Sequence, residues 1–95
     1  MSDPLGQVFG ALADPSRRQV IDYLSARGTA TATELTGELP MTRQAVAKHL
    51  ATLADAGLVE SERQGRETRY RLTETGEEWD DRLDALRQHL QGRNA

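Results

Sequence analysis

The order of local folding signals between residues 31 and 72 constrains this chain more than any other feature of its sequence. Residues 31–39 and 42–56 carry apolar side chains at helical spacing, and a tight connection around Pro40 separates them. A two-stranded ribbon follows at once, over residues 58–63 and 67–72, with a short glycine-containing loop. Two short helices, a tight turn and a hairpin in this order predict a winged helix-turn-helix.

Capping signals mark where these two helices begin. Thr31 precedes Glu34 by three positions, an arrangement in which each side chain satisfies a free backbone N–H at a helix start. Thr42 can cap the second helix, whose buried face is formed by Val46, Leu50 and Leu53. Gly57 is expected to end this helix.

Helices are also predicted on both sides of this unit. Asp-Pro pairs at residues 3–4 and 14–15 start a helix that ends near Ala13 and a second one over about residues 15–26. A last helix runs from Thr73 or Thr75 to about Leu90. The fold class is therefore mostly α with a β-hairpin wing, in the order helix, helix, helix, helix, strand, strand, helix. We expect a single DNA-binding domain over residues 1–95, with dimerisation helices at its two ends.

Length and composition exclude several classes of protein. Ninety-five residues are too few for two domains, and the absence of cysteine excludes disulfides, thiolate metal sites and thiol redox sensing. No apolar run reaches the length of about 18 residues that spans a bilayer, and Met1 to Pro4 lack the features of a secretion signal. We expect a cytoplasmic protein with no membrane partner.

The net charge of −3 hides an uneven distribution. Residues 1–40 carry three Arg and five acids, residues 41–73 six Arg or Lys and four acids, and residues 74–95 three Arg and six acids. The segment that contains the predicted second helix and hairpin is therefore the basic one. A basic surface at this place favours double-stranded DNA as the partner.

The predicted second helix would enter the major groove with its N-terminus first. At 100° per residue, Gln44 and Lys48 point away from Val46, and the small Ala47 lets the helix approach the groove. Together with the cap and the first residue of the helix, the predicted recognition residues are Thr42, Arg43, Gln44, Ala47 and Lys48. The alternative interpretation is a solvated helix face without a ligand.

The predicted hairpin carries three arginines that could hold the DNA backbone or the minor groove, namely Arg63, Arg66 and Arg69. The alternative is that the strand arginines Arg63, Arg69 and Arg71 pair across the ribbon with Glu60, Glu62 or Glu67.

Both terminal helices carry apolar stripes, which we expect to meet their copies across a two-fold axis. The predicted interface residues are Leu5, Val8, Phe9, Leu12, Trp79, Leu83, Leu86 and Leu90.

The sequence contains no pattern of catalytic residues, so we expect no enzymatic activity and no cofactor. His49 and His89 are far apart and lack companions at ligand spacing, so no metal site is predicted within one chain. A site built from Asp84 and His89 of two chains is a less favoured alternative.

Several short motifs, in this order and spacing, resemble the ArsR/SmtB family over almost the whole chain. They are Val8 to Arg17, Glu34-Leu35, Lys48-His49-Leu50, Leu53, Gly57-Leu58-Val59, Gly65-Arg66 and Tyr70-Arg71-Leu72. The resemblance implies a homodimeric winged-helix transcription repressor that binds a palindromic operator. It also implies that Thr42 to His49 form the recognition helix, that Arg63 to Arg69 form the wing, and that the first and last helices form the dimer interface.

This chain differs from many members of that family because it lacks their metal-sensing cysteines. Release from DNA by a metal is therefore not expected. The chain would instead resemble the cysteine-free members that act as autorepressors, or respond to an unknown small molecule or protein. The alternative function is a winged-helix module that docks another protein through its apolar helices or its wing and does not bind DNA.

Overall fold

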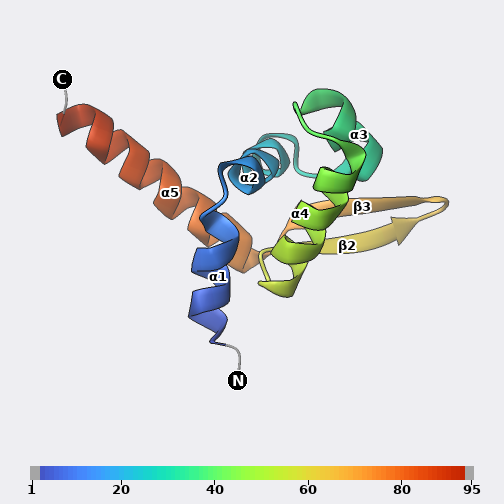
Figure 1. Ribbon diagram of the computed structural model, residues 1–95, viewed down its shortest axis with the longest axis horizontal. Coiled ribbons are helices and arrows are strands. Elements are labelled where there is room, and N and C mark those ends of the chain that lie inside the picture. Colours follow the sequence, from blue (N-terminus) through green and yellow to red (C-terminus); the bar gives the residue numbers. More distant parts are fainter. Residues whose placement is uncertain (1–2, 94–95) are drawn as a thin grey trace.

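A computed structural model of the chain, which describes residues 3–93 and the side chains of residues 3–90, contains the predicted order of helices and hairpin (Figure 1). The predicted helices and strands are confirmed, each end lying within three residues of its predicted position, and one short strand is added. The elements are α1 (Pro4–Leu12), α2 (Pro15–Arg27), β1 (Ala30–Thr31), α3 (Ala32–Glu38), α4 (Arg43–Asp55), β2 (Val59–Gln64), β3 (Glu67–Leu72) and α5 (Glu74–Arg93).

Side-chain caps start the helices at the predicted positions. The Asp14 carboxylate accepts a hydrogen bond from the backbone N–H of Ser16 at 2.8 Å, and this bond lowers the pKa of Asp14. Thr31 and Glu34 form the reciprocal capping box at the start of α3. The Thr42 hydroxyl accepts from the backbone N–H of Ala45 at 3.1 Å at the start of α4.

The hairpin belongs to a three-stranded antiparallel sheet in the order β1-β3-β2. Strands β2 and β3 pair along their full length, and Gly65, with φ of 61°, occupies the first position of the two-residue turn between them. Strand β1 pairs Ala30 with Tyr70 and Thr31 with Arg69. This two-residue strand was not predicted, because it forms only where β3 provides a partner. It attaches the hairpin to the chain that leads into α3.

The core lies between α1, α2, α3, α4 and the base of the hairpin. Its largest fully buried side chains are Val20, Ile21, Leu24, Leu35, Val46, Leu53 and Leu58. The buried face predicted for α4 is confirmed, since Val46, Leu50 and Leu53 are all at most 2 % exposed. Burial of this face determines which side of α4 is left for solvent.

Helix α5 begins against the loop that joins α4 to β2. The Thr73 hydroxyl donates to the Gly57 carbonyl at 2.6 Å and accepts from the N–H of Gly76 at 3.0 Å. A side chain at position 76 would overlap the carbonyl oxygen of Leu58. From this anchor, α5 runs away from the hairpin, and the two project toward opposite ends of a molecule 47 Å long (Figure 1).

None of the helices described here is long and apolar enough to cross a bilayer.

Candidate nucleic-acid interface

Helix α4 presents a polar face opposite its buried one. Gln44, Ala47 and Lys48 are all exposed, as the helical geometry predicts, and Thr42 is exposed at the cap. The first N–H groups of α4 lie beside the same surface, and a helix N-terminus attracts anions. The surface therefore combines a cationic side chain, an amide and backbone donors within two turns of one helix.

Arg43 is exposed but is held by the preceding helix. Its Nη2 donates to the Thr33 hydroxyl on α3 at 3.2 Å. The contact joins the two helices of the helix-turn-helix. It uses only part of the five-donor capacity of the guanidinium, so the remaining donors can reach a ligand.

The arginines of the hairpin fall into two groups. Arg66 lies in the turn, is exposed, and forms no ion pair among the side chains of residues 3–90. Arg63 is also exposed, and its Nε donates to the Gly65 carbonyl at 3.1 Å, which bridges the turn. These two cations lie at the free end of the wing.

The other two arginines are paired with carboxylates. Arg71 contacts Glu60 across the ribbon, with Nε and Oε1 2.8 Å apart. The Arg69 guanidinium lies 3.3 Å from a carboxylate oxygen of Glu34 and 3.3 Å from one of Glu67. Among the described side chains, the predicted pairing across the ribbon therefore holds for Arg71, whereas Arg69 pairs with Glu34 outside the hairpin and with Glu67 on its own strand. The residue that the sequence analysis missed is Glu34: its role in the capping box was visible, but its pairing with a residue 35 positions later depends on the β1-β3 register.

The apolar stripes of the terminal helices are each divided between core and surface. Val8 and Leu12 are 7 % exposed and belong to the core of the chain itself. Leu5, Phe9, Leu86 and Leu90 are 51 to 55 % exposed. Trp79 and Leu83 are half-buried against the core.

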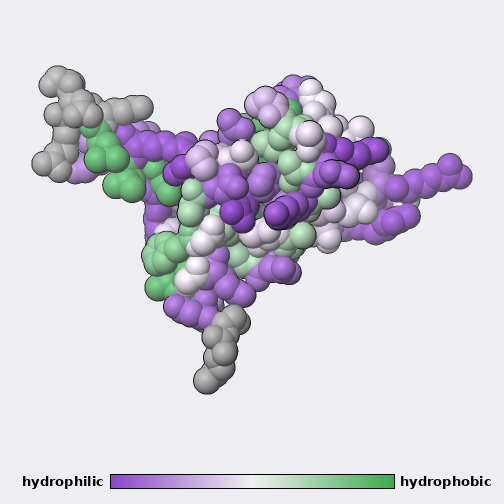
Figure 2. Space-filling view, in the orientation of Figure 1, coloured by the Kyte–Doolittle hydropathy of each residue, from purple (hydrophilic) through white to green (hydrophobic). Residues whose placement is uncertain are grey.

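The two stripes meet where α1 lies against the first half of α5. The rings of Phe9 on α1 and Trp79 on α5 meet edge to face, with centroids 5.5 Å apart and planes at 78°. Figure 2 shows hydrophobic side chains over α1 and over the outer half of α5, on the side of the molecule away from the wing. We call Leu5, Phe9, Leu86 and Leu90 the apolar face.

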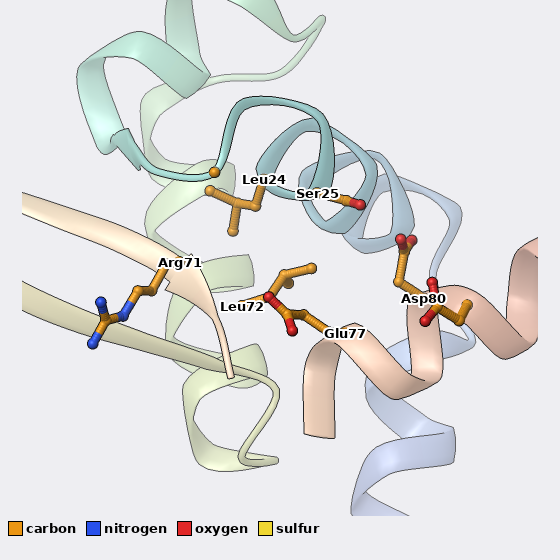
Figure 3. Close-up of a pocket in the computed structure, with 8 residues that line it drawn as sticks. Leu24, Ser25, Arg71, Leu72, Glu77 and Asp80 are labelled. Carbon is orange, nitrogen blue, oxygen red and sulfur yellow. The ribbon is translucent and has the colours of Figure 1, made fainter. Parts of the chain in front are cut away.

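Acidic side chains gather between α2 and α5. A pocket of about 280 Å³ lies between the end of α2, β3 and the start of α5, and Glu77, Asp80 and Asp81 are among its lining residues (Figure 3). Burial raises the pKa of Asp80, which is only 5 % exposed. This concentration of negative charge makes the pocket a poor site for phosphate.

The same region contains the group of carboxylates that could hold a metal. Oxygen atoms of Asp22, Asp80 and Asp84 lie within 4.8 Å of one another. Arg87 contacts Asp22 at 3.5 Å and Asp84 at 3.4 Å, so a cation of the protein already faces these carboxylates. His89 is exposed and is not a member of this group.

Comparison with known sequences identifies the helix-turn-helix independently. The sequence pattern of a helix-turn-helix domain family matches residues 12–62. The uncharacterized HTH-type transcriptional regulator YuzN of Bacillus subtilis is 49 % identical over 65 residues, which are 62 % of this chain and 71 % of that protein. The probable mercury resistance operon repressor of Streptomyces lividans is 34 % identical over 68 residues, which are 72 % of this chain and 54 % of that protein. The transcriptional repressor SdpR of Bacillus subtilis is 30 % identical over 71 residues, which are 75 % of this chain and 78 % of that protein.

Solved structures show the same fold along nearly the whole chain. An ArsR-like transcriptional regulator from Rhodococcus sp. RHA1 is similar with a TM-score of 0.70 and 40 % identity, covering 90 % of this chain and 91 % of that one. The homodimeric winged helix-turn-helix DNA-binding domain Mb0332 from Mycobacterium bovis has a TM-score of 0.77 and 30 % identity, covering 97 % and 82 %. The predicted winged helix-turn-helix is confirmed.

Proposed function

Because this chain belongs to the ArsR/SmtB-type winged helix-turn-helix transcription regulators, we propose that it binds a palindromic operator as a homodimer and represses transcription. The observation that supports this most directly is the exposed polar face of α4, where Gln44 and Lys48 stand opposite a fully buried apolar face. A chain with this function works in the cytoplasm, where its DNA is, and needs no catalytic group.

In the proposed complex, α4 enters the major groove with its N-terminus first. Gln44 suits an adenine edge, Lys48 suits guanine O6 and N7, and the methyl group of Ala47 allows close approach to the bases. Thr42 and the free donors of Arg43 lie at the start of the helix, where they can hold a phosphate.

The wing supplies contacts that carry little sequence information. Arg66 and Arg63 are the cations at its tip, and they would bind phosphates or a narrow minor groove beside the major-groove site. These contacts add affinity for any duplex, whereas Gln44 and Lys48 add preference for one sequence.

The apolar face supports the homodimer. Four large apolar side chains, each about half exposed, are unusual on the surface of a small monomer, and they lie on α1 and α5 together. A two-fold axis through this face would bury the same residues from both copies. It would present the two α4 helices about one helical turn of DNA apart, roughly 34 Å, or a multiple of it.

The same arrangement reconciles DNA binding with the net charge of −3. Six acidic residues, Glu74, Glu77, Glu78, Asp80, Asp81 and Asp84, lie on α5. Since α5 runs away from the hairpin, an α5-centred dimer keeps much of this charge away from the wing tips (Figure 1). The local field at α4 and the wing then decides the interaction with phosphate, rather than the total charge.

Fluorescence anisotropy tests the proposal. The chain is titrated into a labelled duplex taken from upstream of its own coding sequence and into a scrambled duplex, across a salt series. We expect tighter binding to the first duplex and a linear fall of log K with log salt concentration on both. Measurement of the solution mass should give a dimer. A monomer at micromolar concentration that shows no salt-dependent affinity for either duplex would instead support the interaction-module alternative.

A further inference from the structure

The guanidinium of Arg69 contacts oxygen atoms from three segments of the chain. Its Nη1 lies 3.4 Å from the Thr29 hydroxyl, in the connection after α2, and 3.3 Å from Oε1 of Glu34, on α3. Its Nη2 lies 3.3 Å from Oε2 of Glu67, at the start of β3. We call Thr29, Glu34, Glu67 and Arg69 the Arg69 cluster. It connects the wing to the first helix of the helix-turn-helix.

Glu34 is itself held in place. Its Oε1 accepts from the backbone N–H of Thr31 at 3.2 Å, while its own N–H donates to the Thr31 hydroxyl at 3.1 Å. The hydrogen bond from the Thr31 backbone lowers the pKa of Glu34, and the charge of Arg69 lowers it further. Arg69 therefore binds an anion that the capping box keeps ionised and oriented.

The backbone places the same two segments in contact. Arg69 pairs with Thr31 in the β1-β3 ladder, so the cluster lies directly beside the only strand pairing that joins the described hairpin to the chain before α3. That pairing is two residues long on the β1 side. A ladder this short resists rotation of the hairpin weakly, and the side-chain contacts of Arg69 add to that resistance.

We infer, on the basis of the proposed DNA-binding function, that Arg69 is a positioning residue that holds the wing at a fixed angle to α3 and α4, and that it is not a phosphate ligand. Its carboxylate contacts engage both terminal nitrogens of the guanidinium, and its side chain is only 30 % exposed. Arg66, three residues earlier, is exposed at the wing tip and free of such pairs among residues 3–90. Arg69 orients the wing, and Arg66 binds the DNA.

A double-mutant cycle of Arg66→Ala and Arg69→Met on the operator duplex tests this assignment. Both variants should fold, because Arg66 is exposed and forms no ion pair among residues 3–90, and ion pairs with solvent-exposed partners such as Glu34 and Glu67 contribute little to stability. If Arg69 positions the wing, Arg69→Met already removes most of the Arg66 contact. Adding Arg66→Ala should then lower affinity by only about twofold or less, and should not reduce the salt slope further.

Arg71→Met is the matched control. It removes an arginine from the same strand, but its partner Glu60 lies within the hairpin, so the connection to α3 stays intact. In the Arg71→Met background, Arg66→Ala should weaken binding to the operator duplex by the same factor as it does in the wild-type chain. Amide hydrogen exchange without DNA should show faster exchange along the β1-β3 pairing in Arg69→Met and not in Arg71→Met.

Glu34→Gln distinguishes the two roles of Arg69 by the direction of its effect on DNA affinity. Glutamine keeps the capping box but loses the charge that holds Arg69. A positioning role predicts weaker DNA binding, although a negative charge near the DNA has been removed. A phosphate-binding role predicts tighter binding, because Arg69 would be released to the backbone.

The outcomes separate this inference from the proposed function. If the wild-type chain does not bind DNA, the proposed function fails, and the inference fails with it. If the wild type binds but the losses from Arg66→Ala and Arg69→Met add, and each lowers the salt slope by the same amount, the proposed function stands and Arg69 is a phosphate ligand. Tighter binding by Glu34→Gln would likewise overturn the positioning role.

Discussion

Replacement of Arg66 by alanine removes one of the two cations at the tip of the wing and changes little else. The side chain is exposed, forms no ion pair among residues 3–90, and lies next to the turn glycine rather than in the core. The turn itself depends on Gly65, whose φ of 61° stays available in the variant. The folded state should therefore keep its stability, and any loss of DNA binding reports on the contact alone.

The size of the loss follows from counterion release. Each phosphate contact contributes about 0.9 to the slope of log K against log salt concentration, which corresponds to about fivefold in affinity at about 0.15 M salt. A homodimer presents Arg66 twice. The variant should bind about 30-fold more weakly at about 0.15 M salt and only about threefold to fourfold more weakly at about 0.5 M, and its slope should be shallower by about 1.8.

The assay is fluorescence anisotropy on the operator duplex and on a scrambled duplex of equal length, at several salt concentrations. The loss should be the same on both duplexes, because a phosphate contact does not read sequence. Arg66→Lys is the control: it keeps the charge, so its slope should stay close to that of the wild type. A slope unchanged by Arg66→Ala, or a loss confined to the operator, would refute the assignment of this residue to the DNA backbone.

Four further predictions address other parts of the molecule. Gln44→Ala should reduce the preference for the operator over scrambled DNA by about 1–3 kcal/mol, measured as a ratio of dissociation constants, and equal losses on both duplexes would exclude base recognition by this residue. Leu90→Glu places a charge on the apolar face, where Leu90 is 51 % exposed, and should give a folded monomer in sedimentation experiments; a dimer that persists would move the interface elsewhere. Gly76→Ala forces a methyl group against the Leu58 carbonyl and should lower the free energy of unfolding in urea by about 1–3 kcal/mol, whereas a neutral effect would mean that α5 can shift. Burial raises the pKa of Asp80 above its ordinary value of 3.8. Below that pH the carboxyl group is protonated in both the folded and the unfolded protein, so its burial costs no stability through charge. As pH rises through the folded pKa, the folded protein must bury a charge and its stability falls. Asp80→Asn should therefore raise the thermal midpoint at about pH 7 and have little effect near pH 3, and a lower midpoint at pH 7 would contradict this sign.

The local parts of the fold could be predicted from the sequence because their causes lie within a few residues of one another. Caps such as Thr31 and Thr42, the turn at Gly65, and the periodic apolar face of α4 each depend on neighbours along the chain. The exposure of Gln44 and Lys48, the residues proposed to read the bases, followed from the same periodicity, since burying one face of a helix determines the other.

The contacts between distant segments were decided by the tertiary structure alone. Sequence spacing placed Val8 on the same stripe as Phe9, but packing against the core buries Val8 and leaves Phe9 more than half exposed. Likewise, nothing near Arg69 in the sequence shows that its guanidinium meets Glu34, because the pairing of β1 with β3 brings the two together. Local hydrogen bonds and periodicity can be read along a chain, whereas burial and ion pairing depend on which surfaces the finished fold brings into contact.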